Sequence, residues 1–167
     1  MILLINSCVR AGSRTRALAE RVIKNLNDEV REIKIFEENF PSTTEDFLKW
    51  RDERIAAGDY SDPYFDLAKG FASADTIVMA APYWDLSFPA TLKQYIEHIN
   101  VLGITFIYTP EGIPQGLCRA NKLYYVMTAG GNFVPEEFGF GYIKTLAESF
   151  YGIKEVELVK EVGLDIY

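Results

Sequence analysis

The chain has 167 residues, 49% of them hydrophobic and 25% charged, which describes one compact domain that needs no disulfide or metal to hold its core. Seventeen basic and twenty-four acidic residues give a net charge of −7, which argues against non-specific binding to nucleic acid or to an anionic membrane surface. Two cysteines and one histidine exclude a disulfide framework and a His-rich metal site.

The start of the chain has neither the pattern of a secretory signal nor that of a membrane anchor. Met1 runs directly into the apolar residues 2–5, without a basic leader or a cleavage site. No uncharged apolar stretch reaches the length that a transmembrane helix needs. We therefore expect a single domain over residues 1–167, located in the cytoplasm, with both thiols reduced and no membrane insertion.

Five short segments have the composition of β-strands. Three are apolar almost throughout, which is typical of strands buried on both faces of a sheet: Met1–Ile5, Thr76–Ala81 and Leu123–Thr128. Two others, Val30–Phe36 and Val156–Val162, alternate apolar with charged residues. Because charged residues are tolerated better at an edge than in the centre, we place these two at the edges of the sheet.

Helical patterns separate the strands. Apolar residues recur at helical spacing in Arg14–Asn27, Phe88–Leu102 and Glu136–Tyr151, and Ser13 and Ser87 are candidate N-caps. Strands that alternate with helices predict an α/β fold with a parallel sheet. With the charged strands at the edges, the order becomes 2-1-3-4-5, which is the flavodoxin-like three-layer arrangement.

The topology predicts where a ligand binds. In such sheets the site lies beyond the carboxyl ends of the strands, here at the loops Asn6–Ser13, Pro82–Ser87 and Ala129–Pro135. The chain ends shortly after the last strand, so we expect the last covering helix of this fold to be absent from it. We expect either that another subunit covers this face or that the natural protein continues further.

Two segments do not belong to the minimal fold. Glu37–Pro63 is polar and aromatic, with a short helix predicted at Glu45–Ala57. Gly103–Leu117 combines a short β-pattern with several proline and glycine residues, which indicates a strand followed by an extended return loop.

The first loop predicts an anion site. A strand, a hydroxyl-rich loop and a helix N-terminus follow one another, and free N–H groups at such a terminus attract anions. Arg10, Arg14 and Arg16 cluster there in an otherwise acidic chain. The glycine patterns of dinucleotide and triphosphate sites are absent, so we expect a terminal phosphate. The alternative is an ordinary N-cap with solvated arginines.

The other two loops suggest a flat ligand. Tyr83 and Trp84 are consecutive aromatic residues in a loop, where they are costly to leave in water. The alternative is that they cover the core or a subunit contact. Gly130 and Gly131 would let a ligand approach the backbone closely, or would form a simple turn.

The sequence resembles a known family in five segments that occur in the same order. They are Ser7–Leu18, Ala80–Asp85, Pro89–Ile96, Gly103–Thr109 and Thr128–Gly131, and the Gly-x-Thr-Phe-x-Tyr-Thr stretch is the most specific. These segments are similar to the flavodoxin-like NAD(P)H dehydrogenases, the group that contains FMN-dependent NADH azoreductases and quinone reductases. The resemblance implies an FMN-dependent enzyme and a homodimer with a flavin at each end of the interface.

The resemblance also implies roles for individual residues. The FMN phosphate would be held by Ser7, Ser13, Arg14 and Thr15. The isoalloxazine ring would be lined on one side by Pro82, Tyr83, Trp84 and Asp85, and at its pyrimidine end by Thr128, Gly130 and Gly131. The substrate pocket would be shaped by Phe106 and Tyr108, often across the dimer interface.

One departure from the family pattern concerns Asp85, which stands where the azoreductases usually have an amide. A carboxylate beside the ring would oppose the negative charge of the reduced flavin, so we hypothesise a lowered flavin potential or a protonated Asp85. The alternative is that Asp85 turns outward and meets the ring only through its backbone. The loop at Ala129 is also one residue shorter than usual in the family.

The resulting functional prediction is an oxidoreductase that passes a hydride from NADH or NADPH to a quinone, azo or nitro-type acceptor with ping-pong kinetics. The chemistry would take place at flavin N5, so no catalytic side chain is expected. Arg10 or Arg16 could meet the 2′-phosphate of NADPH. A flavodoxin-like electron carrier and a nucleotide-binding regulatory subunit are the alternatives. His98, Cys8 and Cys118 are expected to be structural.

Overall fold

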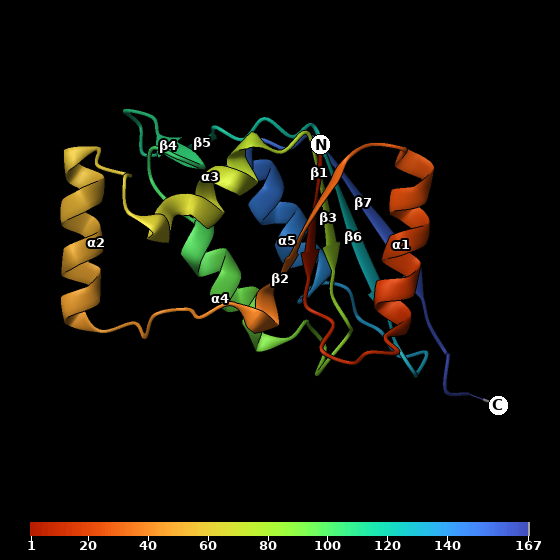
Figure 1. Ribbon diagram of the computed structural model, residues 1–167. Helices are drawn as coiled ribbons and strands as arrows, with labels where there is room; N and C mark the ends of the chain where they lie inside the picture. Colours follow the sequence, from red (N-terminus) through yellow and green to blue (C-terminus); the bar gives the residue numbers. More distant parts are fainter. Residues whose placement is uncertain (167) are drawn as a thin grey trace.

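The computed structural model describes residues 1–166, which fold around a five-stranded sheet (Figure 1). All four strand pairs are parallel, and the order is β2-β1-β3-β6-β7. This is the predicted 2-1-3-4-5 order, with the two charged strands at the edges as expected. The strands are β1 (Ile2–Asn6), β2 (Val30–Lys34), β3 (Thr76–Ala80), β6 (Lys122–Thr128) and β7 (Glu155–Glu161).

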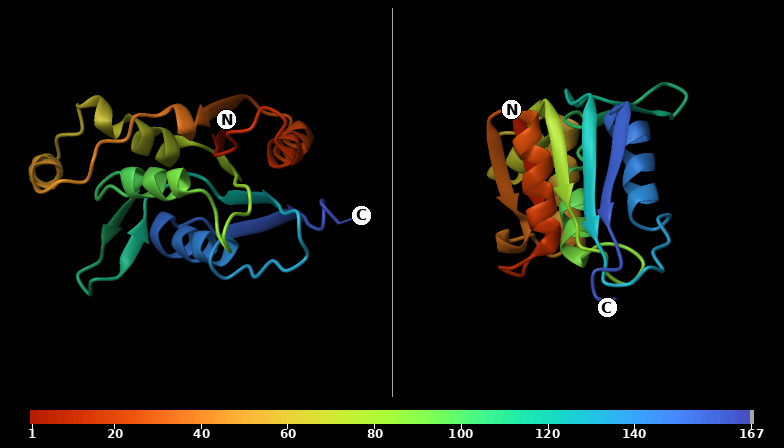
Figure 2. Two further views of the ribbon diagram at one scale, coloured as in Figure 1. Left: turned by 90° about the horizontal axis from the view of Figure 1, so that it is seen from below. Right: turned by 90° about the vertical axis from the view of Figure 1, so that its right-hand side faces the viewer.

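Helices cover the sheet on both faces and complete the three layers (Figure 2). Helix α1 (Arg14–Leu26) packs on one face, whereas α3 (Asp66–Ser73), α4 (Ala90–Ile99) and α5 (Phe140–Leu146) pack on the other. A single π-helical turn, η3 (Ala147–Tyr151), extends α5.

The alternation of side chains in the central strand explains why both faces carry a core. In β1, Leu3 and Ile5 join the large core under α3, α4 and α5, whereas Ile2 and Leu4 join the smaller core under α1. All four side chains are buried. Helix α1 contributes Leu18 to the smaller core. A strand buried on both faces must read as a continuous apolar run, as β1 does.

Beside α1, the outer part of the sheet is charged. Tyr124 and Val159 pack at the border of the smaller core, and Glu157 lies opposite Tyr124 in the strand register. The Lys122 ammonium pairs with the Glu157 carboxylate at 2.8 Å and lies 4.7 Å from the centre of the Tyr124 ring. No helix follows β7 within residues 1–166. The ion pair of Lys122 with Glu157 makes this part of the sheet surface polar, so it tolerates contact with water.

Several boundaries differ from the predicted ones. Strand β2 ends at Lys34 and continues as a 3₁₀ turn, η1 (Ile35–Glu37). Helix α4 begins at Ala90, so the predicted N-cap at Ser87 is wrong. The Ser87 hydroxyl instead donates to the Phe138 carbonyl at 2.6 Å, because the chain forms a tight turn before α4 begins. Helix α5 likewise begins at Phe140, four residues after the predicted start at Glu136.

The sequence analysis missed helix α3 entirely. This helix has only eight residues and includes Gly70, a poor helix former, so its periodic signal is weak. The Asp62-Pro63 pair just before it is a clearer sequence signal for the start of a helical turn. The Asp62 carboxylate accepts a hydrogen bond from the Tyr64 N–H and caps the 3₁₀ turn η2 (Pro63–Phe65) that leads into α3.

The two additional segments lie at the periphery of the fold. Helix α2 (Glu45–Ala57) begins at the N-cap Thr44 and has no buried residue. Strands β4 (Phe106–Tyr108) and β5 (Pro114–Gly116) form an antiparallel hairpin at the amino end of the sheet (Figure 1). The expected return loop therefore contains a second strand. Gly116 is required there, since a Cβ atom would lie 2.1 Å from the Tyr151 backbone carbon.

Two buried tyrosines in the large core give the first prediction. The Tyr151 hydroxyl donates to Asn100 Oδ1, whereas the buried Tyr95 hydroxyl has no partner among residues 1–166. An unsatisfied buried hydroxyl is destabilising, so Tyr95→Phe should keep or raise the free energy of unfolding, by up to about 1 kcal/mol. Tyr151→Phe should lower it by about 1 kcal/mol. Urea denaturation measures both, and an equal loss in the two variants would contradict the assignment.

Candidate functional site

The carboxyl ends of β1, β3 and β6 lie side by side at one end of the sheet, the lower end in Figure 1. The loops that follow these strands enclose a cleft of about 230 Å³. Two arginines, several hydroxyls and two adjacent aromatic residues share its wall. The lining residues are Cys8, Val9, Arg10, Gly12, Ser13, Arg14, Thr15, Pro82, Tyr83, Trp84, Thr128, Ala129, Gly130 and Asp165.

The first loop directs the N-terminus of α1 at this cleft. The Ser13 N–H donates to the Arg10 carbonyl at 3.1 Å, which closes a turn, and Ser13 Oγ accepts from the Arg16 N–H at 3.2 Å. The predicted N-cap at Ser13 is therefore confirmed. The first turn of a helix has N–H groups without intrahelical acceptors, so this end of the cleft suits an anion.

Thr128 connects the first helix with two neighbouring strands. Its hydroxyl lies 2.7 Å from the Thr15 hydroxyl, in a buried contact between the end of β6 and the first turn of α1. Its carbonyl accepts from the Tyr83 N–H at 3.2 Å. Thr15, Tyr83 and Thr128 were all predicted site residues, and these bonds bring them to one wall.

Ser7 has a different position from the one expected. Its side chain is fully buried, its hydroxyl donates to the Ala80 carbonyl at 2.7 Å, and its N–H donates to the same carbonyl at 3.0 Å. Ser7 therefore ties the end of β1 to β3 behind the cleft and does not line it.

The second loop is a tight turn with two non-glycine residues in left-handed conformation. Trp84 and Ser87 exchange two backbone hydrogen bonds of 3.0 and 2.8 Å, and between them Asp85 and Leu86 have φ angles of 50° and 69°. Trp84 is 40% exposed and Leu86 is 42% exposed. The turn holds the indole at the mouth of the cleft, and the Tyr83 hydroxyl donates to the Pro135 carbonyl at 3.0 Å.

Asp85 itself lies outside the cleft and is exposed. Water screens an exposed carboxylate, so we expect Asp85 to affect a ring bound inside the cleft less than a buried carboxylate would. The alternative of the sequence analysis, in which Asp85 turns outward, describes this position.

The third loop contains a contact that the sequence did not indicate. Residues after β7 run back along it, and the N–H groups of Gly163 and Asp165 donate to the Gly131 and Gly130 carbonyls at 2.9 and 3.0 Å. A Cβ atom on Gly130 would lie 2.0 Å from Asp165 Oδ2. A close approach of this chain's own carboxylate therefore explains the glycine at 130, and Gly131 lies beside the cleft without lining it.

Asp165 also pairs with a predicted phosphate ligand. Arg14 Nη1 donates to Asp165 Oδ1 at 2.8 Å and to the Leu164 carbonyl at 3.3 Å. Its hydrogen bond with Arg14 lowers the pKa of the Asp165 carboxyl. No local pattern predicts this contact, because Arg14 and Asp165 are 151 positions apart in the sequence.

Phe106 and Tyr108 lie away from the cleft. Both belong to the hairpin at the amino end of the sheet, where the Phe106 ring packs edge-on against Phe150 and Tyr108. Phe106 is buried, whereas Tyr108 is 52% exposed. Within one chain, neither residue reaches the site at the carboxyl end.

A second and larger hollow, of about 500 Å³, lies between α2 and α4. His98 lines it, but its Nε2 is 2.7 Å from the Tyr64 carbonyl and its ring packs against Tyr64 and Phe40. Burial lowers the pKa of His98. These contacts support the expected structural role.

Residues 1–163 match a family model described as the flavodoxin-like fold. The chain belongs to the flavodoxin-like fold family. This chain is similar to an FMN-dependent NADH:quinone oxidoreductase of Clostridium perfringens. The two are 37% identical over 149 residues, which cover 85% of this chain and 72% of that protein. A second relative, the FMN-dependent NADH:quinone oxidoreductase 2 of Clostridium acetobutylicum, is 35% identical over 164 residues, 92% of this chain and 80% of that one.

Solved structures of this fold family agree with the sequence comparisons. The crystal structure of an azoreductase from Bacillus anthracis has a TM-score of 0.77 and 25% identity, and the match covers 98% of this chain and 87% of that one. The predicted membership in the quinone reductase and azoreductase group is thus confirmed. Within residues 1–166, no helix is long and apolar enough to cross a membrane, and no cluster of three or more His, Cys, Asp or Glu side chains could hold a metal.

The two thiols give the second prediction. Cys8 is 5% exposed, and burial raises the pKa of its thiol, while burial raises that of Cys118 to about 12. Because the thiolate is the reactive form, iodoacetamide at pH 8 should alkylate both native cysteines at least about a hundredfold more slowly than free cysteine.

Peptide mass spectrometry measures this rate for each cysteine, and the protein unfolded in urea is the control. Fast alkylation of Cys8 in the native protein would show that the neighbouring arginines outweigh its burial.

Proposed function

We propose that this chain is an FMN-dependent oxidoreductase that takes a hydride from NADH and passes electrons to a quinone, azo or nitro-type acceptor. The observation that carries the proposal is the cleft itself, in which a helix N-terminus with hydroxyls and two arginines faces two adjacent aromatic residues. One end suits a phosphate and the other a flat ring. The relatives named as FMN-dependent NADH:quinone oxidoreductases support this proposal.

The donors in the cleft fit the parts of FMN. Ser13, Thr15 and the first turn of α1 would hold the phosphate, with Arg10 supplying positive charge. Arg14 would join them only by exchanging its ion pair with Asp165 for the phosphate. Pro82, Tyr83 and Trp84 form the wall for the ring, and the backbone from Thr128 to Gly130 lies at its polar end. When bound, FMN supplies the atom that accepts and later releases the hydride, so the chain needs no acid–base pair of its own.

The protein's task is then to place two flat substrates in turn over one open ring face. A shared face requires the oxidised nicotinamide to leave before the acceptor binds, which is the basis for ping-pong kinetics. NADH is favoured over NADPH, since Arg16 is paired with Glu20 and Glu32 and does not line the cleft. Arg10, the other candidate for the 2′-phosphate of NADPH, is assigned here to the FMN phosphate.

The cleft of one chain is small for the whole cofactor. Its volume of about 230 Å³ is below the range of about 300–1,000 Å³ for pockets that enclose ligands of this size. The loops after β3 and β6 also carry large exposed apolar side chains, namely Trp84, Leu86 and Phe133. We therefore propose a homodimer in which a second copy covers the ring and brings Phe106 and Tyr108 to the substrate. We also propose a cytoplasmic location, where the thiols remain reduced.

The third prediction tests the activity with the purified protein. Reconstitution with FMN should give a bound-flavin spectrum that bleaches within seconds of anaerobic mixing with NADH. Steady-state rates against NADH and a quinone should give parallel lines in double-reciprocal plots, as ping-pong kinetics require. Failure to bind FMN would overturn the proposal. Bound flavin that NADH never reduces would point to an electron carrier or a regulatory subunit.

The fourth prediction tests the phosphate end of the site with two N-cap variants. Ser13→Ala removes the cap of α1, and Thr44→Ala removes the equivalent cap of α2, where Thr44 Oγ1 accepts from the Phe47 N–H at 3.2 Å. Each variant should lose about 1 kcal/mol of stability in urea denaturation.

Fluorescence titration should separate the two variants. Only Ser13→Ala should weaken FMN binding, by about tenfold, because it also removes a hydroxyl from the cleft. Equal FMN affinities in the two variants would place the phosphate elsewhere.

A further inference from the structure

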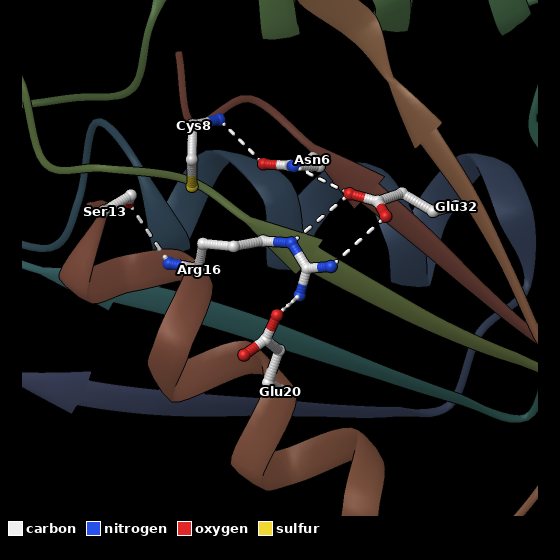
Figure 3. Close-up of polar contacts among 6 residues, drawn as sticks. All are labelled: Asn6, Cys8, Ser13, Arg16, Glu20 and Glu32. Carbon is white, nitrogen blue, oxygen red and sulfur yellow. Dashed lines mark hydrogen bonds and ion pairs between the residues drawn. The ribbon is translucent and has the colours of Figure 1, made fainter. Parts of the chain in front are cut away.

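A polar network behind the cleft joins the first loop to the edge of the sheet (Figure 3). Its centre is Glu32 on strand β2, which does not line the cleft. We propose that Glu32 is a positioning residue that holds the phosphate-binding loop and the N-terminus of α1 in their binding geometry. This inference rests on the proposed FMN site.

Glu32 makes three charge-assisted or polar contacts with two different segments. Its Oε1 accepts from Asn6 Nδ2 at 2.8 Å and from Arg16 Nε at 3.2 Å, and its Oε2 accepts from Arg16 Nη2 at 3.2 Å. The pairing with Arg16 is therefore bidentate, which fixes direction as well as distance. The side chains of Glu32 and Arg16 are only 27% and 25% exposed.

Through Asn6, Glu32 controls how the chain leaves β1. Asn6 is 4% exposed, and its Oδ1 accepts from the Cys8 N–H at 2.8 Å. An amide has one accepting and one donating end, whereas a carboxylate only accepts. Glu32 thus requires Asn6 to present its NH₂ group to the sheet edge and its oxygen to Cys8, the first residue of the cleft wall. Figure 3 shows this chain of bonds from Glu32 to the loop.

Through Arg16, Glu32 controls the first turn of α1. The Arg16 backbone N–H donates to the cap at Ser13, while its guanidinium is held by Glu32 and lies 2.9 Å from Glu20 Oε1. The guanidinium points to the sheet edge in Figure 3 and contributes no lining to the cleft. Arg16 therefore connects the capped end of the helix to β2 and is not available as a phosphate ligand.

Positioning and plain electrostatics predict opposite effects for the removal of the Glu32 charge. A negative charge near a phosphate site repels the ligand, so its removal alone would strengthen FMN binding. If Glu32 holds the loop, its removal weakens FMN binding, because the Asn6 amide is then free to turn and Arg16 loses its bidentate partner. The sign of the change therefore decides between the two.

The fifth prediction compares Glu32→Gln with Glu20→Gln as a matched control. Both variants remove one carboxylate that pairs with Arg16, and only Glu32→Gln disturbs Asn6. Glu32→Gln should raise the dissociation constant of FMN about tenfold, whereas Glu20→Gln should leave it within about twofold. Binding of riboflavin, which lacks the phosphate, should change little in either variant, so the ratio of FMN to riboflavin affinity should fall only in Glu32→Gln.

A double-mutant cycle tests the route through Asn6. If Glu32 acts through this amide, adding Glu32→Gln to Asn6→Ala should weaken FMN binding by much less than Glu32→Gln does alone. Additive losses would refute the route through Asn6. An unchanged FMN affinity in Glu32→Gln, or parallel losses of FMN and riboflavin affinity, would overturn the inference. In all of these cases Ser13→Ala still reports on the phosphate site independently, and absence of FMN binding in the wild-type protein would instead overturn the proposed function.

Discussion

The parallel pairing of β1 with both β2 and β3 is the constraint on which the site depends. The chain leaves β1 toward α1 on one face of the sheet, whereas it leaves β3 toward α4 on the other face. The two loops therefore diverge at the carboxyl ends of the strands, and a cleft opens between them. Because β1 is central and covered on both faces, its sequence has to be apolar from Ile2 to Ile5.

Hydrogen bonds between the loops give the divergent edge a defined shape. Ser7 ties β1 to β3, Thr15 contacts Thr128 across the cleft wall, and Tyr83 reaches the third loop at Pro135. Each bond joins segments that are far apart in the sequence. A site held in this way is largely preorganised, so a ligand has to order little of the backbone when it binds.

The parts of the fold that could be predicted from the sequence are those with a periodic signal. The apolar runs of β1, β3 and β6 and the charged edge strands determined the strand order, and the order located the loops at the site. Helix α3 was missed because eight residues with a central glycine carry too little periodicity. Side-chain direction cannot be read from the sequence, and of the FMN contacts that the resemblance implies, Ser7, Asp85 and Gly131 do not line the cleft. The contacts of Asp165 with Arg14 and Gly130 could not be predicted either, because they join segments that only the folded structure brings together.

The turn at Asp85 and Leu86 has a consequence for how this loop can change over time. Two consecutive residues with side chains hold positive φ angles there, a conformation that costs free energy for any residue but glycine and that asparagine and aspartate tolerate best. Leu86 is the less suited of the two. A β-branched residue at position 86 would be strained at this φ angle, so we expect it to open the turn and move the neighbouring indole. The backbone torsion angles of this turn therefore limit which residues can replace Asp85 and Leu86, independently of any ligand that the cleft binds.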